Sequence, residues 1–417
     1  MSIKKGLLLT LTTSLFFLSM AQEHEYVTIH GFISQGFFAS KSYNYISEES
    51  RDGSWEMRTI GINFQKEIAN KFRVGIQFLT RDEGVYGNNA ITLDWATGSY
   101  SPSDMLTISV GRNKIPLGLY TEVQDYDFLT PFAIMPSAIY EKGLRSVSSF
   151  IDGIQINGNL DLNKGGDLSY ALTFGDIDSK NSADMSYYLE SLGLGTTENT
   201  KMDYAFGAGV TYNSPITGLK LTSSYLLMNN WQIDKGHISV LDTYLDKKTN
   251  INWFYVGASY TGRYFDIMAE WHRRFMIEDV ILSKRDSSGN YNQIPTSIVP
   301  QAQDTVNRGG WYIGAVVKPL EWLNFGGYFQ DYRDRYDDFQ YIYGKPIDYD
   351  AVSNINRDGA LTLSFIYKNI LTVKLEGHLV YGTALLSKPM NSDVLNMGKF
   401  ANGDRWQYGI IKVSYNF

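Results

Sequence analysis

The chain has 417 residues, of which 37 are basic and 44 acidic, giving a net charge of −7. This acidic balance argues against a nucleic-acid partner. Cysteine is absent, which excludes disulfides, thiol catalysis and thiolate metal sites. Aromatic residues are abundant, with 30 Tyr, 22 Phe and 8 Trp, whereas only 10 Pro are present. A chain of this length without disulfides has to draw its stability from extensive strand pairing or from a large core.

Residues 1–21 have the organisation of a secretory signal. Two lysines at positions 4 and 5 precede an apolar stretch at 6–18, and small residues flank a cleavage point after Ala21. A buried N-terminal helix is the alternative, but such a helix would need polar residues at a regular period. We therefore predict export, removal of residues 1–21 and a mature chain of 35 basic against 44 acidic residues, with a charge of −9.

Beyond the signal, apolar and polar residues alternate with period two in one segment after another. In 370–381, for example, Leu375 and Leu379 alternate with Glu376 and His378. Most segments are long enough for a tilted strand to cross a bilayer, which takes roughly 9 to 11 residues. Sixteen segments are predicted as strands: 27–39, 55–67, 71–81, 89–100, 105–114, 149–160, 167–176, 203–213, 218–229, 251–261, 264–276, 309–318, 322–333, 358–367, 370–381 and 405–417.

Connections between these segments alternate between short and long along the whole chain. The seven short ones are 68–70, 101–104, 161–166, 214–217, 262–263, 319–321 and 368–369. The eight long ones are 40–54, 82–88, 115–148, 177–202, 230–250, 277–308, 334–357 and 382–404. Short turns on one side and long loops on the other are typical of outer-membrane barrels. A soluble propeller is the alternative, but no motif recurs at a fixed period.

The predicted fold is therefore all-β, a transmembrane antiparallel β-barrel of 16 strands in a single domain, 22–417. A closed sheet satisfies every backbone donor and acceptor in lipid. Aromatic residues near strand ends are predicted to form interfacial girdles: Trp55, Trp95, Tyr100, Trp253, Tyr264, Trp271, Trp311 and Trp322. Polar residues on the opposite face are predicted to line the lumen: Arg73, Gln77, Arg81, Asp94, Gln155, Asn157, Lys220, Asp266, Glu270, His272, Arg274, Lys374, Glu376, His378 and Lys412.

The longest connection, 115–148, is unusually apolar for a loop, with many Phe, Leu, Ile and Pro residues. Such a segment is not expected to stand free in water. A barrel of 16 strands is wide enough to hold a channel. We therefore expect this third extracellular loop to fold into the lumen and narrow it.

Several short motifs resemble the phosphate- and polyphosphate-selective porin family. They are Ile29-His30-Gly31-Phe32, the run Val110-Gly111-Arg112-Asn113-Lys114-Ile115-Pro116-Leu117-Gly118, and Pro131, Pro136, Tyr140 and Asp152-Gly153. The resemblance implies a homotrimeric 16-stranded porin in which the third loop forms the constriction. The charged candidates at that constriction are then Arg112, Lys114, Glu122, Asp125, Asp127, Glu141, Lys142 and Arg145. The acidic members depart from the family's basic eyelet, so phosphate selectivity is not carried over.

The C-terminal strand also resembles that of bacterial outer-membrane barrels. Ile411, Val413, Tyr415 and Phe417 alternate with polar residues, and the chain ends on the aromatic side chain. In those proteins this strand is handed to the barrel-assembly machinery. We expect a location in the outer membrane of a Gram-negative bacterium, in contact with lipid, and pairing of Phe417's strand with 27–39.

Catalysis and metal binding have little support in the sequence. No Gly-x-Ser-x-Gly elbow is present. The pairs Glu270/His272 and Glu376/His378 lack an evident third metal ligand, so lumen lining is the simpler reading. The acidic residues Asp176, Asp178, Asn181 and Asp184 resemble a divalent-cation loop only loosely. We expect no enzyme activity, no cofactor and no metal.

The predicted function is a porin that lets small hydrophilic solutes or ions diffuse passively through a water-filled channel. A different class of function stays open: a barrel that serves as a sheath or scaffold for a partner protein, such as an electron-transfer conduit. Loop 115–148 discriminates between them, because a sheath would not need a loop that fills its own lumen.

Overall fold

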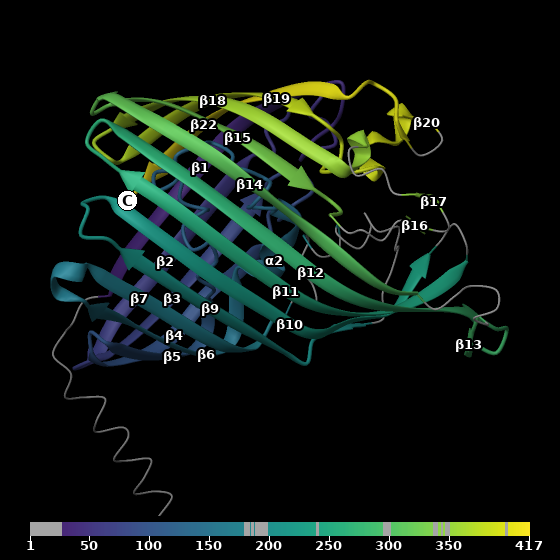
Figure 1. The fold of residues 1–417 in the computed structure, drawn as a ribbon, viewed down its shortest axis with the longest axis horizontal. Helices are drawn as coiled ribbons and strands as arrows, with labels where there is room; N and C mark the ends of the chain where they lie inside the picture. The colour runs from purple at the N-terminus through teal and green to yellow at the C-terminus, as the bar shows by residue number, and fades with distance from the viewer. Residues whose placement is uncertain are drawn as a thin grey trace, which may run out of the picture.

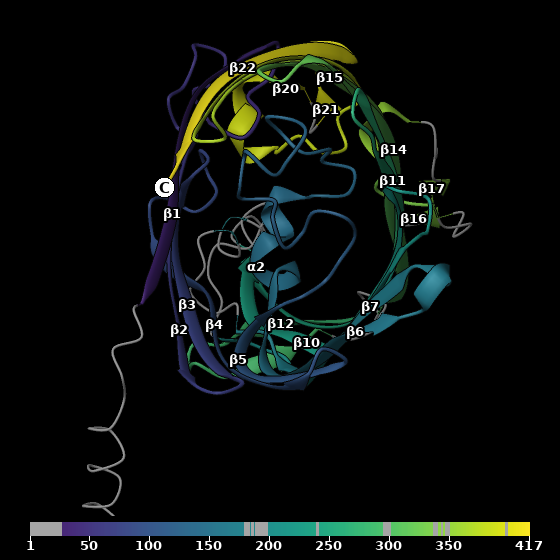
Figure 2. The same cartoon turned by 90° about the vertical axis from the view of Figure 1, so that its left-hand side faces the viewer.

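An 18-stranded antiparallel sheet forms the body of the protein (Figures 1 and 2). Two of its strands, β8 and β13, have only three residues each, and the other sixteen form the barrel wall. The computed structural model describes residues 27–178, 184, 187, 199–238, 242–294, 302–336, 341–342, 345–346, 351–396 and 399–417. The predicted signal 1–21 lies outside the described residues.

The wall strands follow one another as antiparallel neighbours. They are β1 (Thr28–Lys41), β2 (Arg58–Ala69), β3 (Phe72–Asp82), β4 (Ile91–Ser103), β5 (Leu106–Lys114), β6 (Phe150–Asp161), β7 (Asp167–Asp176), β9 (Tyr204–Asn213), β10 (Leu219–Ile238), β11 (Thr243–Thr261), β12 (Phe265–Arg285), β14 (Ala302–Leu320), β15 (Leu323–Arg333), β18 (Ile355–Tyr367), β19 (Leu371–Tyr381) and β22 (Arg405–Asn416).

Short elements occupy the connections. They are the turns of helix η1 (Lys142–Leu144), α2 (Arg145–Ser148), η2 (Asn163–Gly165), η3 (Val352–Asn354) and η4 (Pro389–Val394), and the strands β8 (Asn199–Lys201), β13 (Tyr291–Gln293), β16 (Tyr341–Ile342), β17 (Lys345–Pro346), β20 (Leu395–Asn396) and β21 (Lys399–Phe400). Among the described residues, no helix is long and apolar enough to cross a membrane.

The barrel closes where the last strand meets the first. β22 pairs with β1 from Phe32 opposite Asn416 to Lys41 opposite Gln407, while β1 pairs with β2 on its other side. Two backbone hydrogen bonds of 2.9 Å join Gly31 and Phe417 beyond the regular ladder. The wall therefore has no free edge, which satisfies the backbone of every strand within the protein.

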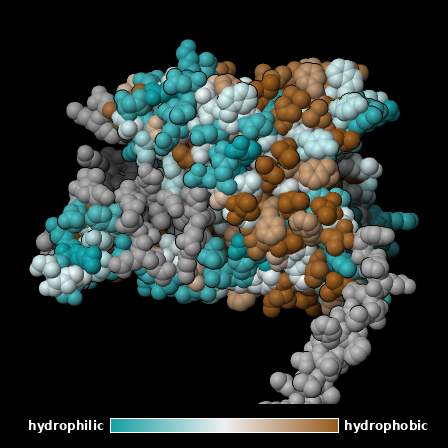
Figure 3. All heavy atoms as spheres, turned by 180° about the vertical axis from the view of Figure 1, so that it is seen from behind, coloured by the Kyte–Doolittle hydropathy of each residue, from teal (hydrophilic) through white to brown (hydrophobic). Residues whose placement is uncertain are grey.

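Apolar side chains face outward along the half of the barrel nearest the short turns. On β12, Phe265, Ile267 and Trp271 are exposed, whereas Glu270 and His272 are buried. The same alternation on other strands of the wall produces the apolar surface band in Figure 3, which shows the side opposite to β12. This pattern is what a lipid-facing wall requires, because the side chains of a strand point alternately to its two faces.

All sixteen predicted strands are present, and the predicted antiparallel barrel is confirmed. Four strands are longer than the sequence indicated: β10, β11, β12 and β14 have 19 to 21 residues each. The predicted loops 230–250 and 277–308 are therefore largely strand. The halves of these four strands that lie on the long-loop side carry polar residues. Lys247 of β11 and Glu278 of β12, for example, form an ion pair of 2.8 Å. Charged residues interrupt the alternation in these segments, although Ile277 and Ile281 of β12 are still exposed.

Two predicted girdle residues face inward instead, Trp253 and Trp95. Trp95 lies opposite the buried Gln77 and forms a hydrogen bond with Tyr126 of loop 115–148. Trp253 is 2% exposed and its indole N–H donates to His272 Nδ1 at 2.6 Å. Its neighbours on β11, Phe254 and Val256, are 42% and 52% exposed. Since adjacent residues of a strand point to opposite faces, Trp253 belongs to the inner side of the wall and not to a girdle.

Glycines of the wall allow loop 115–148 to approach closely. Figure 2 shows α2 and the chain before it within the outline of the ring of strands. A Cβ atom added to Gly209 would lie 2.7 Å from Pro116 Cγ and 2.8 Å from the Pro116 carbonyl oxygen. A Cβ atom on Gly314 would lie 2.8 Å from the ring of Phe132. The loop backbone and its apolar side chains thus fill space that any larger wall residue would occupy.

We expect Gly209→Val to lower the stability of the folded barrel by roughly 1–3 kcal/mol, since the new side chain overlaps the backbone of Pro116. Guanidinium unfolding followed by tryptophan fluorescence would measure the loss. Gly377→Val is the matched control, because a Cβ atom there meets nothing within 4 Å. Equal stability of the two variants would contradict the close packing of the loop against β9.

Candidate functional site

A buried carboxylate on β19 holds the backbone of loop 115–148. Glu376 accepts hydrogen bonds of 2.8 Å from the amides of both Ala133 and Ile134. It is 5% exposed and also accepts from the Thr362 hydroxyl. A carboxylate has room for about four donors, so two consecutive amides can be bound by one side chain.

A second carboxylate, on β12, holds the start and the end of the same loop. Glu270 accepts from the Leu119 amide at 2.6 Å and from the Tyr140 hydroxyl at 2.5 Å. The Tyr312 hydroxyl, from β14, donates to the same carboxylate at 2.8 Å. These contacts join two loop residues, 21 positions apart, to one point of the wall.

Two further wall residues complete the anchoring. Lys374 donates to the carbonyl oxygens of Asp127, Thr130 and Phe132 at 2.6, 2.7 and 3.1 Å. The side-chain oxygen of Gln330 accepts from the Ala138 amide at 3.0 Å. Backbone groups of the loop therefore bond to polar side chains on four strands in place of water. These bonds offset the free-energy cost of burying backbone amides and carbonyls.

His378 connects the Glu376 clamp to a neighbouring strand. Its Nε2 lies 3.0 Å from Glu376 Oε1, and its Nδ1 lies 2.9 Å from Asp358 Oδ2. The ring stacks on Tyr408 with centroids 3.8 Å apart and planes inclined by 12°. His378 is thus a positioning residue that fixes the orientation of the carboxylate that holds the loop.

Ion pairs between loop 115–148 and the wall form one cluster around Asp94 of β4. Lys114 lies 2.7 Å from the Asp94 carboxylate, and Arg145 lies 3.1 Å from it. Asp125 pairs with Arg145 and lies 3.9 Å from Lys114. Gln77 donates to Asp94 at 2.8 Å. Two cations and two anions therefore neutralise one another at this point.

A second cluster surrounds Glu83, which follows β3. The carboxylate of Glu83 lies 2.7 Å from Lys142 Nζ and 3.1 Å from the Arg81 guanidinium. Arg81 also pairs with Asp184 at 2.6 Å. Asp184 belongs to the segment that the sequence likened loosely to a cation loop, and here its carboxylate meets an arginine. Within the described residues, no group of three or more histidine and acidic side chains is arranged to hold a metal ion.

The two clusters border a small cavity of about 40 Å³. We call the charged residues that line it the charged ring: Arg81, Glu83, Asp125, Lys142, Arg145 and Lys412. Lys412, from β22, pairs with Asp127 at 2.8 Å. A larger cavity of about 610 Å³ lies on the side of the short turns, where Lys220 and Asp266 are among its lining residues.

The structure brings most of the eight predicted constriction residues together, but not all. Arg112 pairs with Asp152 at 2.6 Å and lies over the ring of Phe150. Asp152 shares its strand alternation with the exposed Ile154 and Ile156, so this pair belongs to the outer side of the wall. The prediction for Arg112 is therefore wrong. The regular alternation of β5 places Arg112 on the same face as the exposed Ile108 and Val110.

Two further constriction candidates, Glu141 and Glu122, lie outside the charged ring. Glu141 pairs with Arg274 of β12 at 3.2 Å, above the charged ring on the side of the long loops. Glu122 is exposed. Among the lumen candidates, Arg73 is exposed near the short turns, and Gln155 donates to Thr173 of β7 at 2.9 Å. The role of this set as a constriction stays a prediction.

Sequence reasoning missed two members of the site, Glu83 and Asp184. Both lie in connections whose length and composition carry no periodic signal. Their partners are distant in the chain: Lys142 is 59 residues from Glu83, and Arg81 is 103 residues from Asp184. Only the closure of the barrel brings these charges together.

The charged ring shifts the ionisation of its acids. Burial alone raises the pKa of Glu83, but Lys142 and Arg81 outweigh burial and hold that pKa at about 2. Burial likewise raises the pKa of Asp125, and the adjacent Arg145 and Lys114 bring it far below its usual range. Both carboxylates are therefore charged at any physiological pH, which keeps the ring as a set of ion pairs.

Solved structures with the same fold are outer-membrane proteins. OmpT of Vibrio cholerae matches with a TM-score of 0.57 and 9% identity, over 95% of this chain and 99% of that chain. An anion-selective porin from Comamonas acidovorans matches at 0.52 and 11%, over 94% and 99%. The outer-membrane channel DcaP of Acinetobacter baumannii matches at 0.53 and 12%, over 94% and 97%.

No protein-family model matches this chain, and no sequence among curated proteins does. The likeness to the solved structures therefore establishes the fold, which is that of porins and outer-membrane channels. It does not extend to the phosphate-selective family, and it carries no statement about a solute.

We expect Glu376→Gln to loosen loop 115–148, because an amide group offers one acceptor where the carboxylate binds two amides. Leaving one buried donor unpaired costs roughly 1–3 kcal/mol. Hydrogen exchange at Ala133 and Ile134 would accelerate accordingly. Glu67→Gln, at an exposed position on β2, is the control. Unchanged exchange at both amides would rule out the clamp.

We also expect acid to destabilise the charged ring. The pKa of Glu83 is lowered on folding from 4.5 to about 2, so its stabilisation is complete above pH 4.5 and is lost as the pH falls toward 2. Thermal unfolding of Glu83→Gln should therefore depend less on pH in that window than unfolding of the unmodified protein. Glu321→Gln, in the turn between β14 and β15, is the control. Parallel pH profiles for Glu83→Gln and the unmodified protein would refute the assignment.

Proposed function

We propose that the protein is an outer-membrane porin through which small hydrophilic solutes or ions diffuse passively. The observation that carries the proposal is the anchoring of loop 115–148 to the wall by Glu270, Lys374 and Glu376, with a charged ring beside it. A loop fixed across a wide barrel would narrow the passage for solutes. The likeness in fold to porins and channels supports the same conclusion.

The anchored loop favours a channel over a sheath for a partner protein. A sheath has to leave its lumen free for the protein that it encloses. On this proposal, buried side chains such as Phe132 and Ile134 take up that space. The wall has glycine at contacts such as Gly314, where a larger residue would overlap Phe132. An enzyme would in turn need a nucleophile and a base within hydrogen-bonding reach, and the proposal assigns no such pair.

The charged ring favours small solutes of either sign rather than phosphate. Its basic residues are each matched by a carboxylate, as Lys142 is by Glu83 and Arg145 by Asp125. A multivalent anion would have to compete with these buried partners for every contact. The resemblance to phosphate-selective porins thus carries over in layout and not in selectivity.

The remaining features of the proposal follow from the fold and the sequence. An exported chain that loses residues 1–21 would reach the outer membrane through the periplasm. Its C-terminal strand would engage the barrel-assembly machinery before it pairs with β1. A homotrimer in contact with outer-membrane lipid is the proposed assembly, and a neighbouring fold, OmpT of Vibrio cholerae, has been solved in a trimer form.

The experiment that tests the channel is planar-bilayer recording with the purified full-length protein. We expect stepwise conductance, and we expect replacement of residues 119–139 by a short Gly-Ser linker to raise the unit conductance. The replacement removes Leu119, Ala133 and Ile134, whose amides Glu270 and Glu376 bind, so that water can reach these carboxylates.

The matched control is removal of residues 287–289 from the exposed turn between β12 and β13. That change shortens a connection without touching loop 115–148, so its unit conductance should equal that of the unmodified protein. Absence of stepwise conductance in the unmodified protein would sink the channel proposal. An unchanged unit conductance after replacement of 119–139 would show that the loop is not the constriction.

A further inference from the structure

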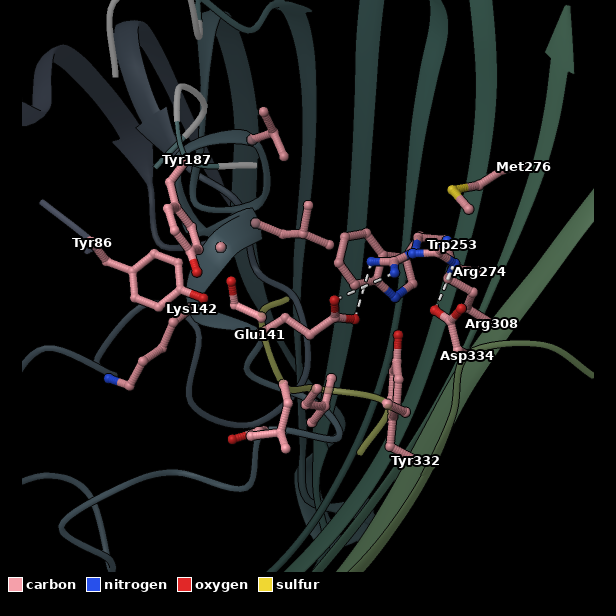
Figure 4. A pocket seen from close by; sticks show the side chains of 18 of the residues that line it. Tyr86, Glu141, Lys142, Tyr187, Trp253, Arg274, Met276, Arg308, Tyr332 and Asp334 are labelled. Atoms are coloured by element: carbon pink, nitrogen blue, oxygen red, sulfur yellow. Dashed lines mark hydrogen bonds and ion pairs between the residues drawn. The ribbon is translucent and has the colours of Figure 1, made fainter. Parts of the chain in front are cut away.

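A second cavity, of about 190 Å³, lies on the long-loop side of the charged ring (Figure 4). It is bounded by residues 141–144 and 147 of the third loop and by the inner faces of β10, β11, β12, β14 and β15. Drug-sized ligands occupy pockets of roughly 300–1,000 Å³. This cavity, which we call the vestibule, therefore suits a solute of only one small ring.

Aromatic side chains border the vestibule on opposite sides. Figure 4 shows Tyr86 and Tyr187 on one side, Trp253 and Tyr332 on the other, and Glu141 between them. Trp253 is held in place, because its N–H donates to His272 and the Arg274 guanidinium lies 4.6 Å from its ring centroid. Rigid aromatic walls provide apolar contact at little entropic cost.

The charges of the vestibule are balanced. Arg274 pairs with Glu141 at 3.2 Å, Arg308 pairs with Asp334 at 3.2 Å, and Lys142 pairs with Glu83 at 2.7 Å. A charged solute would have to separate one of these pairs, which leaves a partly buried charge without its partner. A neutral solute with hydroxyl groups does not, since a hydroxyl both donates to a carboxylate and accepts from a guanidinium.

We propose that the vestibule binds a neutral, polyhydroxylated solute of monosaccharide size before the solute reaches the charged ring. The hydroxyl groups of such a solute would meet the paired Arg308 and Asp334, and its C–H groups would rest against the aromatic walls. This inference rests on the proposed channel function and adds to it the class of solute that the channel retains.

The test measures binding separately from conduction. Purified full-length protein is titrated with D-glucose, D-galactose and L-arabinose while tryptophan fluorescence is recorded, and the same sugars are added to single channels in a planar bilayer. Sodium gluconate and glycerol, at equal osmolality, serve as a charged and an undersized probe. We expect a saturable fluorescence change and a matching block of current with at least one sugar, and neither with gluconate or glycerol.

Two vestibule variants and one control localise the site. Asp334→Asn removes the charge that Arg308 pairs with, and Tyr86→Leu removes one aromatic wall; each should weaken sugar binding by roughly tenfold or more. Asp286→Asn changes an exposed turn outside the barrel and should bind as the unmodified protein does. Because Tyr86 and Asp334 lie at different ends of the vestibule, misfolding of one variant leaves the other as a test.

The outcomes separate the two proposals. Conduction without saturable binding of any of the three sugars overturns the vestibule assignment and leaves the channel standing. Saturable sugar binding without conduction overturns the channel and leaves the site. Stronger binding of gluconate than of the sugars, or equal affinity in all three variants, also overturns the assignment.

Discussion

The closure of the sheet between β1 and β22 is the constraint on which the rest of the molecule depends. In lipid, a backbone amide or carbonyl without a partner is too costly to tolerate, so the last strand has to find the first. That requirement sets the register from Phe32 opposite Asn416 onward and extends the ladder to Gly31 and Phe417. It also places β3, β4 and β22 around one lumen, so that Arg81, Asp94 and Lys412 can surround the same loop.

The buried loop 115–148 faces the same constraint as a strand in lipid, because its backbone also loses water. The solution differs, since the loop has no ladder to join. Side chains of the wall take over. Glu376 binds two consecutive amides, and Lys374 binds three carbonyl oxygens between Asp127 and Phe132. The negative carboxylate thus binds backbone N–H groups, and the positive ammonium binds backbone carbonyl oxygens. These charge-assisted hydrogen bonds hold the loop without regular secondary structure.

The sequence predicts the wall well and the interior only in part. Lipid imposes an outward apolar face on residues such as Ile267 and Leu379, so period two identifies the strands directly. The halves of β10 and β12 on the long-loop side were predicted as loops. Trp231 and Ile233 of β10 are buried in the interior, and charged residues such as Glu278 and Lys284 interrupt the apolar alternation of β12. Trp253 has the composition of a girdle residue, and only its position between Asn252 and Phe254 in the folded strand shows that it points inward. Pairs such as Arg81 with Asp184 depend on closure, which no local pattern encodes.

The anchoring of loop 115–148 has a consequence for the order of assembly. Its partners Glu270 and Glu376 follow it in the chain by more than a hundred residues, on β12 and β19. Until those strands arrive, Phe132 and Ile134 have no apolar surroundings and the loop amides have no acceptors. In the export route proposed above, the unfolded chain would therefore keep this apolar segment without its partners until β12 and β19 are in place.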